Sequence, residues 1–250
     1  MPPANPIAVV TGGAGGIGAA ICKALAAADF CVVVGYRSSK AEAEVLASQL
    51  PGAGHVALST PVTNSAALRE MAQDVTRRYG QCDVLVNCAG TTRFVPHDDL
   101  DGLDDDLIDD ILLTNVRGNF ATLRALLPLL KISTQPGGGA VVNISSIAAR
   151  TAMGSNVMYC ASKAAVDNMT QSLARALAPA VRVISVAPGL VGTEFVQALD
   201  PAWRDEQVSR TPLGRLAAPE EIARAVVAAV RDLTFTTGCV IPVDGGRPLN

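Results

Sequence analysis

Short runs of β-branched and apolar residues alternate with helical stretches along the chain, and this alternation restricts the possible folds more than any other feature of the sequence. The pattern predicts strands at 7–10, 31–34, 55–58, 84–87, 140–144, 181–186 and 239–243. It predicts helices at 17–28, 39–50, 65–79, 104–130, 159–178 and 219–231. Nearly continuous apolar strands that alternate with helices form a parallel sheet covered on both faces. Because such crossovers are right-handed, we expect an α/β fold with a doubly wound parallel sheet, a single Rossmann-like domain over residues 1–250.

Charge and composition exclude several classes of function. The formal net charge is -3, which argues against a nucleic-acid surface. No apolar run approaches the ~18 residues of a transmembrane helix, and residues 1–6 lack the basic region of a signal peptide. Six cysteines show no C-x-x-C spacing, and the two histidines belong to no metal-ligand cluster. We therefore expect a cytoplasmic protein that has no metal and does not bind nucleic acid or membrane.

A glycine-rich segment lies between the first predicted strand and the first predicted helix. Residues 11–18 read TGGAGGIG and fit both G-x-G-x-x-G and T-G-x-x-x-G-x-G. Glycines let the backbone approach a pyrophosphate, and the helix N-terminus presents free N–H groups to it. A plain tight turn is the alternative, but the position between strand and helix favours dinucleotide binding.

The end of the second predicted strand discriminates between two cofactors. An acidic side chain there would bind the ribose hydroxyls of NAD, but the chain has Gly35-Tyr36-Arg37-Ser38. Arg37 can pair with a 2′-phosphate, and Ser38 can add a hydroxyl donor. The absence of a carboxylate predicts NADP rather than NAD, with a solvated surface arginine as the alternative.

Tyr159 and Lys163 stand four residues apart in a predicted helix, so both face the same side. An ammonium beside a phenol favours the phenolate and lowers the pKa of the phenol, which makes the tyrosine a usable proton donor and acceptor near neutral pH. A solvated helix face is the alternative explanation of this pair.

These features together resemble the short-chain dehydrogenase/reductase family over essentially the whole chain, and within it the 3-oxoacyl acyl-carrier-protein reductases. The matching motifs, in chain order, are Thr11-Gly12-x-x-x-Gly16-Ile17-Gly18, Asn87-Cys88-Ala89-Gly90, Asn115, Ser146, Tyr159-x-x-x-Lys163, Pro188-Gly189 and Thr193. Each motif is common by itself, but their joint order and spacing are specific.

The resemblance implies a catalytic tetrad. Tyr159 would be the general acid in reduction and the base in oxidation, and Lys163 would support it and hold the nicotinamide ribose. Ser146 would hydrogen-bond the substrate carbonyl, with Ser145 as the rival hydroxyl. Asn115 would hold a water that links Lys163 to solvent.

The resemblance also implies a set of cofactor-binding residues. They are Gly12, Gly15, Gly16, Ile17, Gly18, Arg37, Ser38, Val62, Asn87, Ala89, Gly90, Tyr159, Lys163, Pro188, Gly189, Val191 and Thr193. Three departures from the family pattern concern cofactor fit. Gly15 replaces a basic residue of many NADP-dependent members, Pro61 replaces an aspartate near the adenine, and Cys88 replaces an asparagine.

We expect the substrate pocket to be lined by residues 91–96, 148–158 and 190–207, the last as a lid. Arg93 and Arg150 are candidate anchors for an acidic substrate. Eight aspartates between Asp98 and Asp110 predict a solvated loop and helix start rather than a metal site.

The resemblance implies an NADP-dependent oxidoreductase that interconverts a ketone and a secondary alcohol, with a 3-oxoacyl thioester among the candidates. An acidic acyl carrier protein would require basic residues by the cleft, and Ala-Pro-Ala at 178–180 weakens that case. The alternatives are a cofactor-binding sensor or regulator, and a lyase or epimerase on the same fold. The resemblance further implies a homotetramer in which helices 104–130 and 159–178 pair across one interface.

Overall fold

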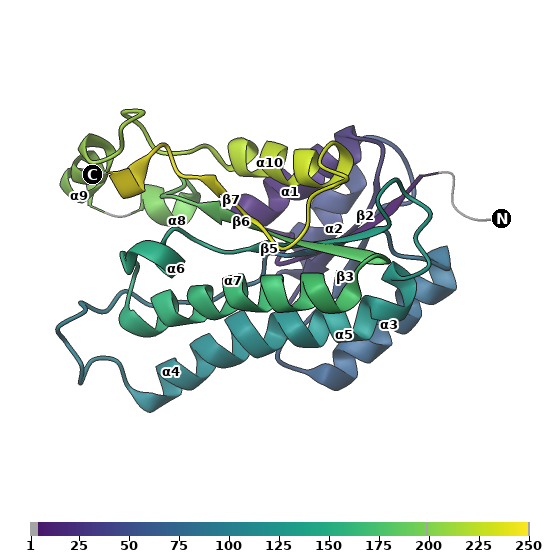
Figure 1. Ribbon diagram of the computed structural model, residues 1–250, viewed down its shortest axis with the longest axis horizontal. Helices are drawn as coiled ribbons and strands as arrows, with labels where there is room; N and C mark the ends of the chain where they lie inside the picture. Colours follow the sequence, from purple (N-terminus) through teal and green to yellow (C-terminus); the bar gives the residue numbers. More distant parts are fainter. Residues whose placement is uncertain (1–4, 199, 250) are drawn as a thin grey trace.

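Seven parallel strands form one twisted sheet in the order β3-β2-β1-β4-β5-β6-β7 (Figure 1). The computed structural model describes residues 5–198 and 200–249. The strands are β1 (Ile7–Thr11), β2 (Cys31–Tyr36), β3 (Val56–Ser59), β4 (Val84–Asn87), β5 (Gly139–Ile144), β6 (Val181–Pro188) and β7 (Val240–Val243). The strand order reverses between β1 and β4, and ligands of doubly wound sheets bind at such a reversal. The predicted α/β fold with a parallel sheet is confirmed.

Helices cover both faces of the sheet (Figure 1). One layer contains α1 (Gly16–Ala27), α2 (Lys40–Gln49) and α10 (Pro219–Arg231). The opposite layer contains α3 (Ser65–Tyr79), α5 (Asn119–Leu130) and α7 (Val157–Leu177). Side chains of one strand alternate between the two cores: Ala8 and Val10 pack against the first layer, and Ile7 and Val9 against the second.

The predicted helix at 104–130 is interrupted. It consists of α4 (Asp105–Leu112), a π-helical turn η1 (Leu113–Gly118) and α5. A π-helical turn adds a residue to the helical repeat and occurs mostly at functional sites. It contains Asn115, and Asn115 is fully buried.

Short helices α6 (Ala148–Thr151), α8 (Glu194–Gln197) and α9 (Pro201–Ser209) were not predicted, nor was the 3-10 turn η2 (Arg247–Leu249). Pieces of four to nine residues show too few repeats for hydrophobic periodicity to reveal them. The segment 190–207, expected as a lid, therefore carries α8 and most of α9, while its Leu199 lies outside the described residues.

Buried polar side chains cross the sheet beneath the carboxyl ends of its central strands. Asn87, Asn143 and Ser185 occupy neighbouring register positions on β4, β5 and β6. The Asn87 amide donates to Asn143 Oδ1 at 2.9 Å, and the Asn143 amide donates to the Thr170 hydroxyl on α7 at 2.8 Å. The Thr170 and Ser185 hydroxyls are 2.9 Å apart. This series of hydrogen-bonded side chains, which we call the polar row, joins three strands to α7.

The N-terminus of α10 is held by Glu221. Its carboxylate accepts hydrogen bonds from Arg215 at 2.6 and 2.8 Å and from the Ala218 N–H at 2.8 Å. These bonds, that to Arg215 first, lower the pKa of Glu221 to about 2 from an ordinary 4.5.

We predict that the contribution of Glu221 to stability depends on pH. Because its pKa is depressed in the folded protein, this contribution is complete above pH 4.5 and is lost as the pH falls toward 2. The melting temperature should therefore fall less steeply over this range in Glu221→Gln than in the wild type. Glu220→Gln is the control, because Glu220 is exposed and has no ion-pair partner among the described residues. An equal fall in melting temperature between pH 4.5 and pH 2 in the wild type and Glu221→Gln would contradict the prediction.

Candidate active site

A cleft of about 700 Å³ opens at the carboxyl ends of the strands, where the strand order reverses. Four parts of the chain line it: the glycine turn, the end of β2, the segment after β4, and the residues that follow β5 and β6. Every predicted cofactor-binding residue except Asn87 lines this cleft. Asn87 is buried beneath it, in the polar row.

The glycine turn has a backbone that few other residues could adopt or fit. Gly12 and Gly16 have positive φ values of 63° and 48°. A Cβ on Gly12 would lie 3.0 Å from the Cα of Ala89, and a Cβ on Gly18 would lie 2.1 Å from the Gly12 carbonyl oxygen. Gly15 differs, because nothing lies within 4 Å of a Cβ built on it.

The Thr11 side chain joins the two walls of the cleft. Its hydroxyl oxygen accepts hydrogen bonds from the N–H groups of Cys88 and Ala89, both at 3.1 Å. The glycine turn and the segment 87–90 are therefore fixed to each other. Thr11 was expected only as part of the glycine motif, and this second role depends on a contact between residues far apart in sequence.

Arg37 and Ser38 line the cleft immediately after β2. Both are exposed, and among the described residues Arg37 has no ion-pair or hydrogen-bond partner. Its guanidinium is therefore available to an anionic group in the cleft.

Tyr159 and Lys163 lie on the first two turns of α7 and face the cleft. The Lys163 ammonium is 5.6 Å from the centroid of the Tyr159 ring and donates to the Ile144 carbonyl at 2.9 Å. Lys163 is buried, and its charge also acts on the Cys88 thiol, whose pKa burial raises to about 11. A buried ammonium without a carboxylate partner among the described residues favours a neighbouring anion.

Asn115 lies behind this pair rather than in the wall of the cleft. Its Oδ1 accepts from the Thr91 N–H at 2.8 Å, and its amide donates to the Thr91 carbonyl and the Ser162 hydroxyl, both at 3.1 Å. A Cβ on Gly90 would contact both Asn115 Oδ1, at 3.3 Å, and Lys163 Nζ, at 3.8 Å. Asn115 and Lys163 therefore approach the same point, and Oδ1 keeps one free lone pair there.

The two adjacent serines after β5 have different surroundings. The Ser145 hydroxyl is buried and donates to the Lys163 carbonyl at 3.4 Å. The Ser146 hydroxyl is half-buried and accepts from the Ala148 N–H at 3.1 Å, so its proton remains free to donate. This arrangement favours Ser146 as the hydroxyl that a substrate oxygen would meet.

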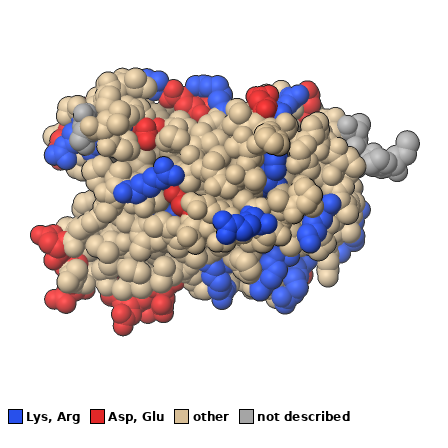
Figure 2. Space-filling model, in the orientation of Figure 1, with Lys and Arg blue, Asp and Glu red and all other residues tan. Residues whose placement is uncertain are grey.

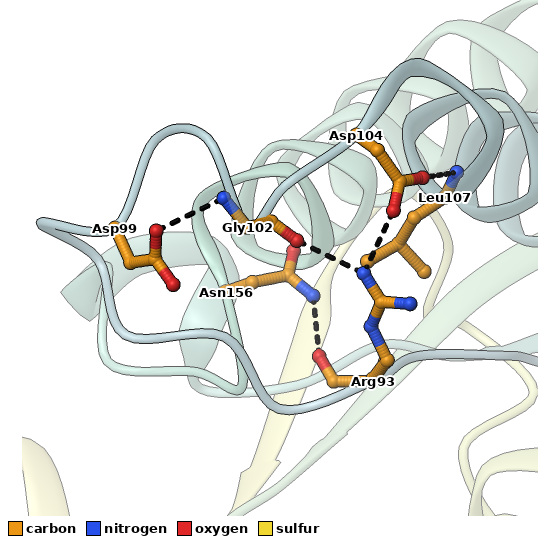
Figure 3. A network of polar contacts seen from close by, with 6 residues as sticks. All are labelled: Arg93, Asp99, Gly102, Asp104, Leu107 and Asn156. Atoms are coloured by element: carbon orange, nitrogen blue, oxygen red, sulfur yellow. Dashed lines mark hydrogen bonds and ion pairs between the residues drawn. The ribbon is translucent and has the colours of Figure 1, made fainter.

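The two arginines expected as substrate anchors lie outside the cleft lining. Arg93 is engaged within its own loop, where its guanidinium contacts Asp104 Oδ2 at 3.0 Å and the Gly102 carbonyl at 2.9 Å (Figure 3). Arg150 is exposed at α6. The interpretation of Arg93 as an anchor is weakened, because its charge already has a partner.

The run of aspartates forms an acidic surface next to this loop (Figure 2). Asp104 caps α4, accepting from the Leu107 N–H at 2.8 Å, and Asp99 accepts from the Gly102 N–H at 2.9 Å. The Leu107 N–H and the Arg93 guanidinium lower the pKa of Asp104 below its usual value. Within the described part of the chain, no three histidine, cysteine or acidic side chains converge as a metal site would require.

Sequence reasoning missed Asn156, which caps α7 and accepts a hydrogen bond from the Tyr159 N–H at 2.7 Å. The helix was expected to begin at Tyr159, but it begins at Val157. An asparagine just before a helical stretch is an N-cap signal, so the capping rule could have found it.

Comparison with known proteins gives a consistent family. A family model described as "Enoyl-(Acyl carrier protein) reductase" matches residues 12–247. A protein of Streptomyces violaceoruber, named as a ketoacyl reductase of the granaticin polyketide synthase, is 40% identical and covers 99% of this chain and 98% of its own. The cis-4-hydroxycyclohexanecarboxylate dehydrogenase of Sinomonas cyclohexanicum is 36% identical, covering 97% and 96%.

A solved structure agrees with the sequence relatives. It is described as a short-chain dehydrogenase/reductase from Burkholderia xenovorans, and it has a TM-score of 0.90 and 33% identity over 99% of this chain and 100% of that one. The chain belongs to the short-chain dehydrogenase/reductase family, and it is an oxidoreductase of that family, whose members use NAD(P). It is similar to 3-oxoacyl acyl-carrier-protein reductases, such as that of Staphylococcus epidermidis, with 31% identity over 97% of this chain and 98% of that protein.

The residues of the cleft fit a dinucleotide. The turn at Gly12 and Gly18 leaves no room for side chains, so its backbone can closely approach a pyrophosphate, and α1 directs its N-terminus at the cleft. Among the described residues, no helix is both long and apolar enough to cross a membrane.

We predict that two alanine substitutions in the glycine turn have opposite outcomes. Gly18→Ala should lower the melting temperature and abolish dinucleotide binding, because its Cβ would overlap the Gly12 carbonyl and this outweighs the ~1 kcal/mol that alanine gains inside a helix. Gly15→Ala should leave the melting temperature near wild type, because no protein atom lies within 4 Å of the added Cβ. Thermal melting and NADPH fluorescence titration of the two variants test this. Equal behaviour of the two would contradict the account of the turn.

Proposed function

We propose that this protein is an NADP-dependent reductase that interconverts a ketone and a secondary alcohol, with Tyr159 as general acid and base. The observation that carries the proposal is the convergence of Tyr159, Lys163 and Ser146 in one cleft with the glycine turn. A bound reduced nicotinamide would supply the hydride.

The protein's own side chains would supply the proton and stabilise the negative charge that develops on the substrate oxygen. Ser146 would donate a hydrogen bond from its hydroxyl to the substrate carbonyl oxygen and so orient the carbonyl. Tyr159 would protonate that oxygen as negative charge develops on it, and the buried ammonium of Lys163 would stabilise the resulting phenolate. Asn115 would hold a water near Lys163 through its remaining lone pair, giving the tyrosine a route to solvent protons.

Support for NADP comes from the end of β2. Arg37 and Ser38 border the cleft, the Arg37 guanidinium has no partner among the described residues, and no carboxylate stands at this position to bind ribose hydroxyls. Position 15 is a glycine and supplies no basic side chain. Arg37 is therefore the main source of affinity for a 2′-phosphate.

Support for a ketone substrate comes from the relatives. One is named for a ketoacyl group, which contains a ketone, and one for a hydroxycyclohexane carboxylate, which contains a secondary alcohol. A 3-oxoacyl thioester and an alicyclic ketone are therefore the two candidate substrate types. The homotetramer, the single domain over residues 1–250 and the cytoplasmic location remain predictions.

We predict that Tyr159→Phe abolishes ketone reduction and changes the Kd for NADPH far less. The variant keeps the ring that packs on α7 but lacks the proton that the oxygen of the product needs, so kcat should fall by about a thousandfold or more. NADPH oxidation with a panel of ketones and 3-oxoacyl thioesters measures kcat, and fluorescence titration measures Kd. Retained turnover in the variant would overturn the mechanism. Tight NADPH binding by the wild type without turnover on a broad panel would favour the sensor or lyase alternatives.

We predict that Arg37→Ala weakens NADPH binding by about ten- to a hundredfold and leaves NADH binding almost unchanged, because only NADPH carries the 2′-phosphate. Titration with each cofactor gives the two Kd values. Arg78→Ala is the matched control, since Arg78 is an exposed arginine that is not part of the cleft lining. A wild type that prefers NADH would show that Arg37 does not select the cofactor.

A further inference from the structure

Asn156 joins α7 to the loop after β4. It precedes α7, it is completely buried, and its Oδ1 accepts from the Tyr159 N–H at 2.7 Å. The helix turn that carries the Tyr159 side chain is therefore anchored by this one carbonyl oxygen.

The amide group of Asn156 reaches the loop after β4. It donates to the Arg93 carbonyl at 2.8 Å (Figure 3). It also donates to the Thr92 hydroxyl at 3.2 Å. Thr92 lines the cleft. A single side chain thus fixes the distance between the backbone of the proposed acid and one wall of the pocket.

The residues just before Asn156 reinforce this connection. The Ser155 carbonyl accepts from the Val95 N–H at 2.8 Å, and the Ser155 and Thr92 hydroxyls are 2.5 Å apart. A Cβ on Gly154 would lie 3.1 Å from Cδ1 of Tyr159, so this segment packs directly on the tyrosine ring. Segment 154–156 therefore contacts Tyr159 both at its backbone and at its ring.

The loop after β4, which Asn156 contacts, is held together by contacts between its own residues. The Arg93 guanidinium bonds to the Gly102 carbonyl and to Asp104, and Asp104 caps α4 at Leu107 (Figure 3). A displacement at Asn156 would consequently be transmitted to the start of α4 as well as to Tyr159.

We propose that Asn156 is a positioning residue, which sets Tyr159 relative to the wall of the pocket that holds the ketone. The inference rests on the proposed reductase function. The amide has two separable roles, because its oxygen holds Tyr159 and its nitrogen holds the loop.

Two substitutions separate these roles. Asn156→Asp keeps an oxygen for the Tyr159 N–H but cannot donate to the Arg93 carbonyl, so the loop should shift while the helix start is kept. We expect the KM for the ketone to rise by about tenfold with kcat within about threefold of wild type. Asn156→Ala loses both roles, and we expect kcat to fall by about tenfold or more in addition. The Kd for NADPH should stay within about twofold in both variants, because Asn156 is not part of the cleft lining.

Asn64→Ala is the matched control. Asn64 likewise caps a helix with its side-chain oxygen, accepting from Ala66 N–H at 3.0 Å and Ala67 N–H at 3.1 Å at the start of α3, and it is exposed. It should lower the melting temperature as a lost cap does, while kcat and the ketone KM remain unchanged. If Asn156→Ala does not fold, Asn156→Ser, which keeps a capping oxygen and lacks the amide, is measured instead and should raise the ketone KM as Asn156→Asp does.

The outcomes are distinguishable. Unchanged kcat and ketone KM in the Asn156 variants would overturn the positioning role and leave the reductase function in place. A parallel loss of NADPH affinity and activity would also overturn it, because that result indicates general destabilisation. A wild type that reduces no ketone would overturn both proposals.

Discussion

The polar row beneath the cleft is the interaction on which the rest of the site depends. A parallel sheet is usually held by apolar contacts, which tolerate small sliding of a helix over a strand. Here Asn143 donates to Thr170, and Thr170 meets Ser185, so α7 has a fixed position above β5 and β6. Buried polar groups are costly when unpaired, and therefore a shift in register would be penalised along the whole row. The fixed α7 in turn carries Tyr159 and Lys163.

The proposed catalytic groups Ser146, Tyr159 and Lys163 come from two elements that the polar row connects. Lys163 donates to the carbonyl of Ile144, the last residue of β5, and Ser146 follows two residues later. The positions of Ser146, Lys163 and Tyr159 are thus all fixed relative to the end of β5. Pre-organisation of this kind removes the need to order the groups during the reaction, which is the main contribution a protein makes when a cofactor supplies the redox chemistry.

The parallel sheet and most element bounds could be predicted from apolar periodicity, and the family resemblance indicated the cofactor side of the cleft. Segment 148–158 was expected to line the substrate pocket, but it contributes no residue to the cleft lining. Contacts between distant segments could not be predicted. Asn87 was expected in the wall of the cleft but lies below it, because its partner is Asn143 on the neighbouring strand. Arg93 was a candidate anchor for a substrate, with a solvated arginine as the alternative, and it pairs with Asp104 across a folded loop. The π-helical turn at Asn115 has no periodic signature, since the hydrophobic pattern continues through it.

The closed loop of Arg93 and Asp104 has an electrostatic consequence for how molecules approach the cleft. Since the charge of Arg93 is paired within the loop, the surrounding aspartates leave a surface of acidic side chains next to it (Figure 2), and such a surface carries a negative potential. Anionic molecules would approach against that field over roughly one Debye length, about 8 Å at physiological ionic strength, whereas neutral molecules would not experience it. The acidic loop therefore acts on the rate of encounter before any contact in the pocket is made.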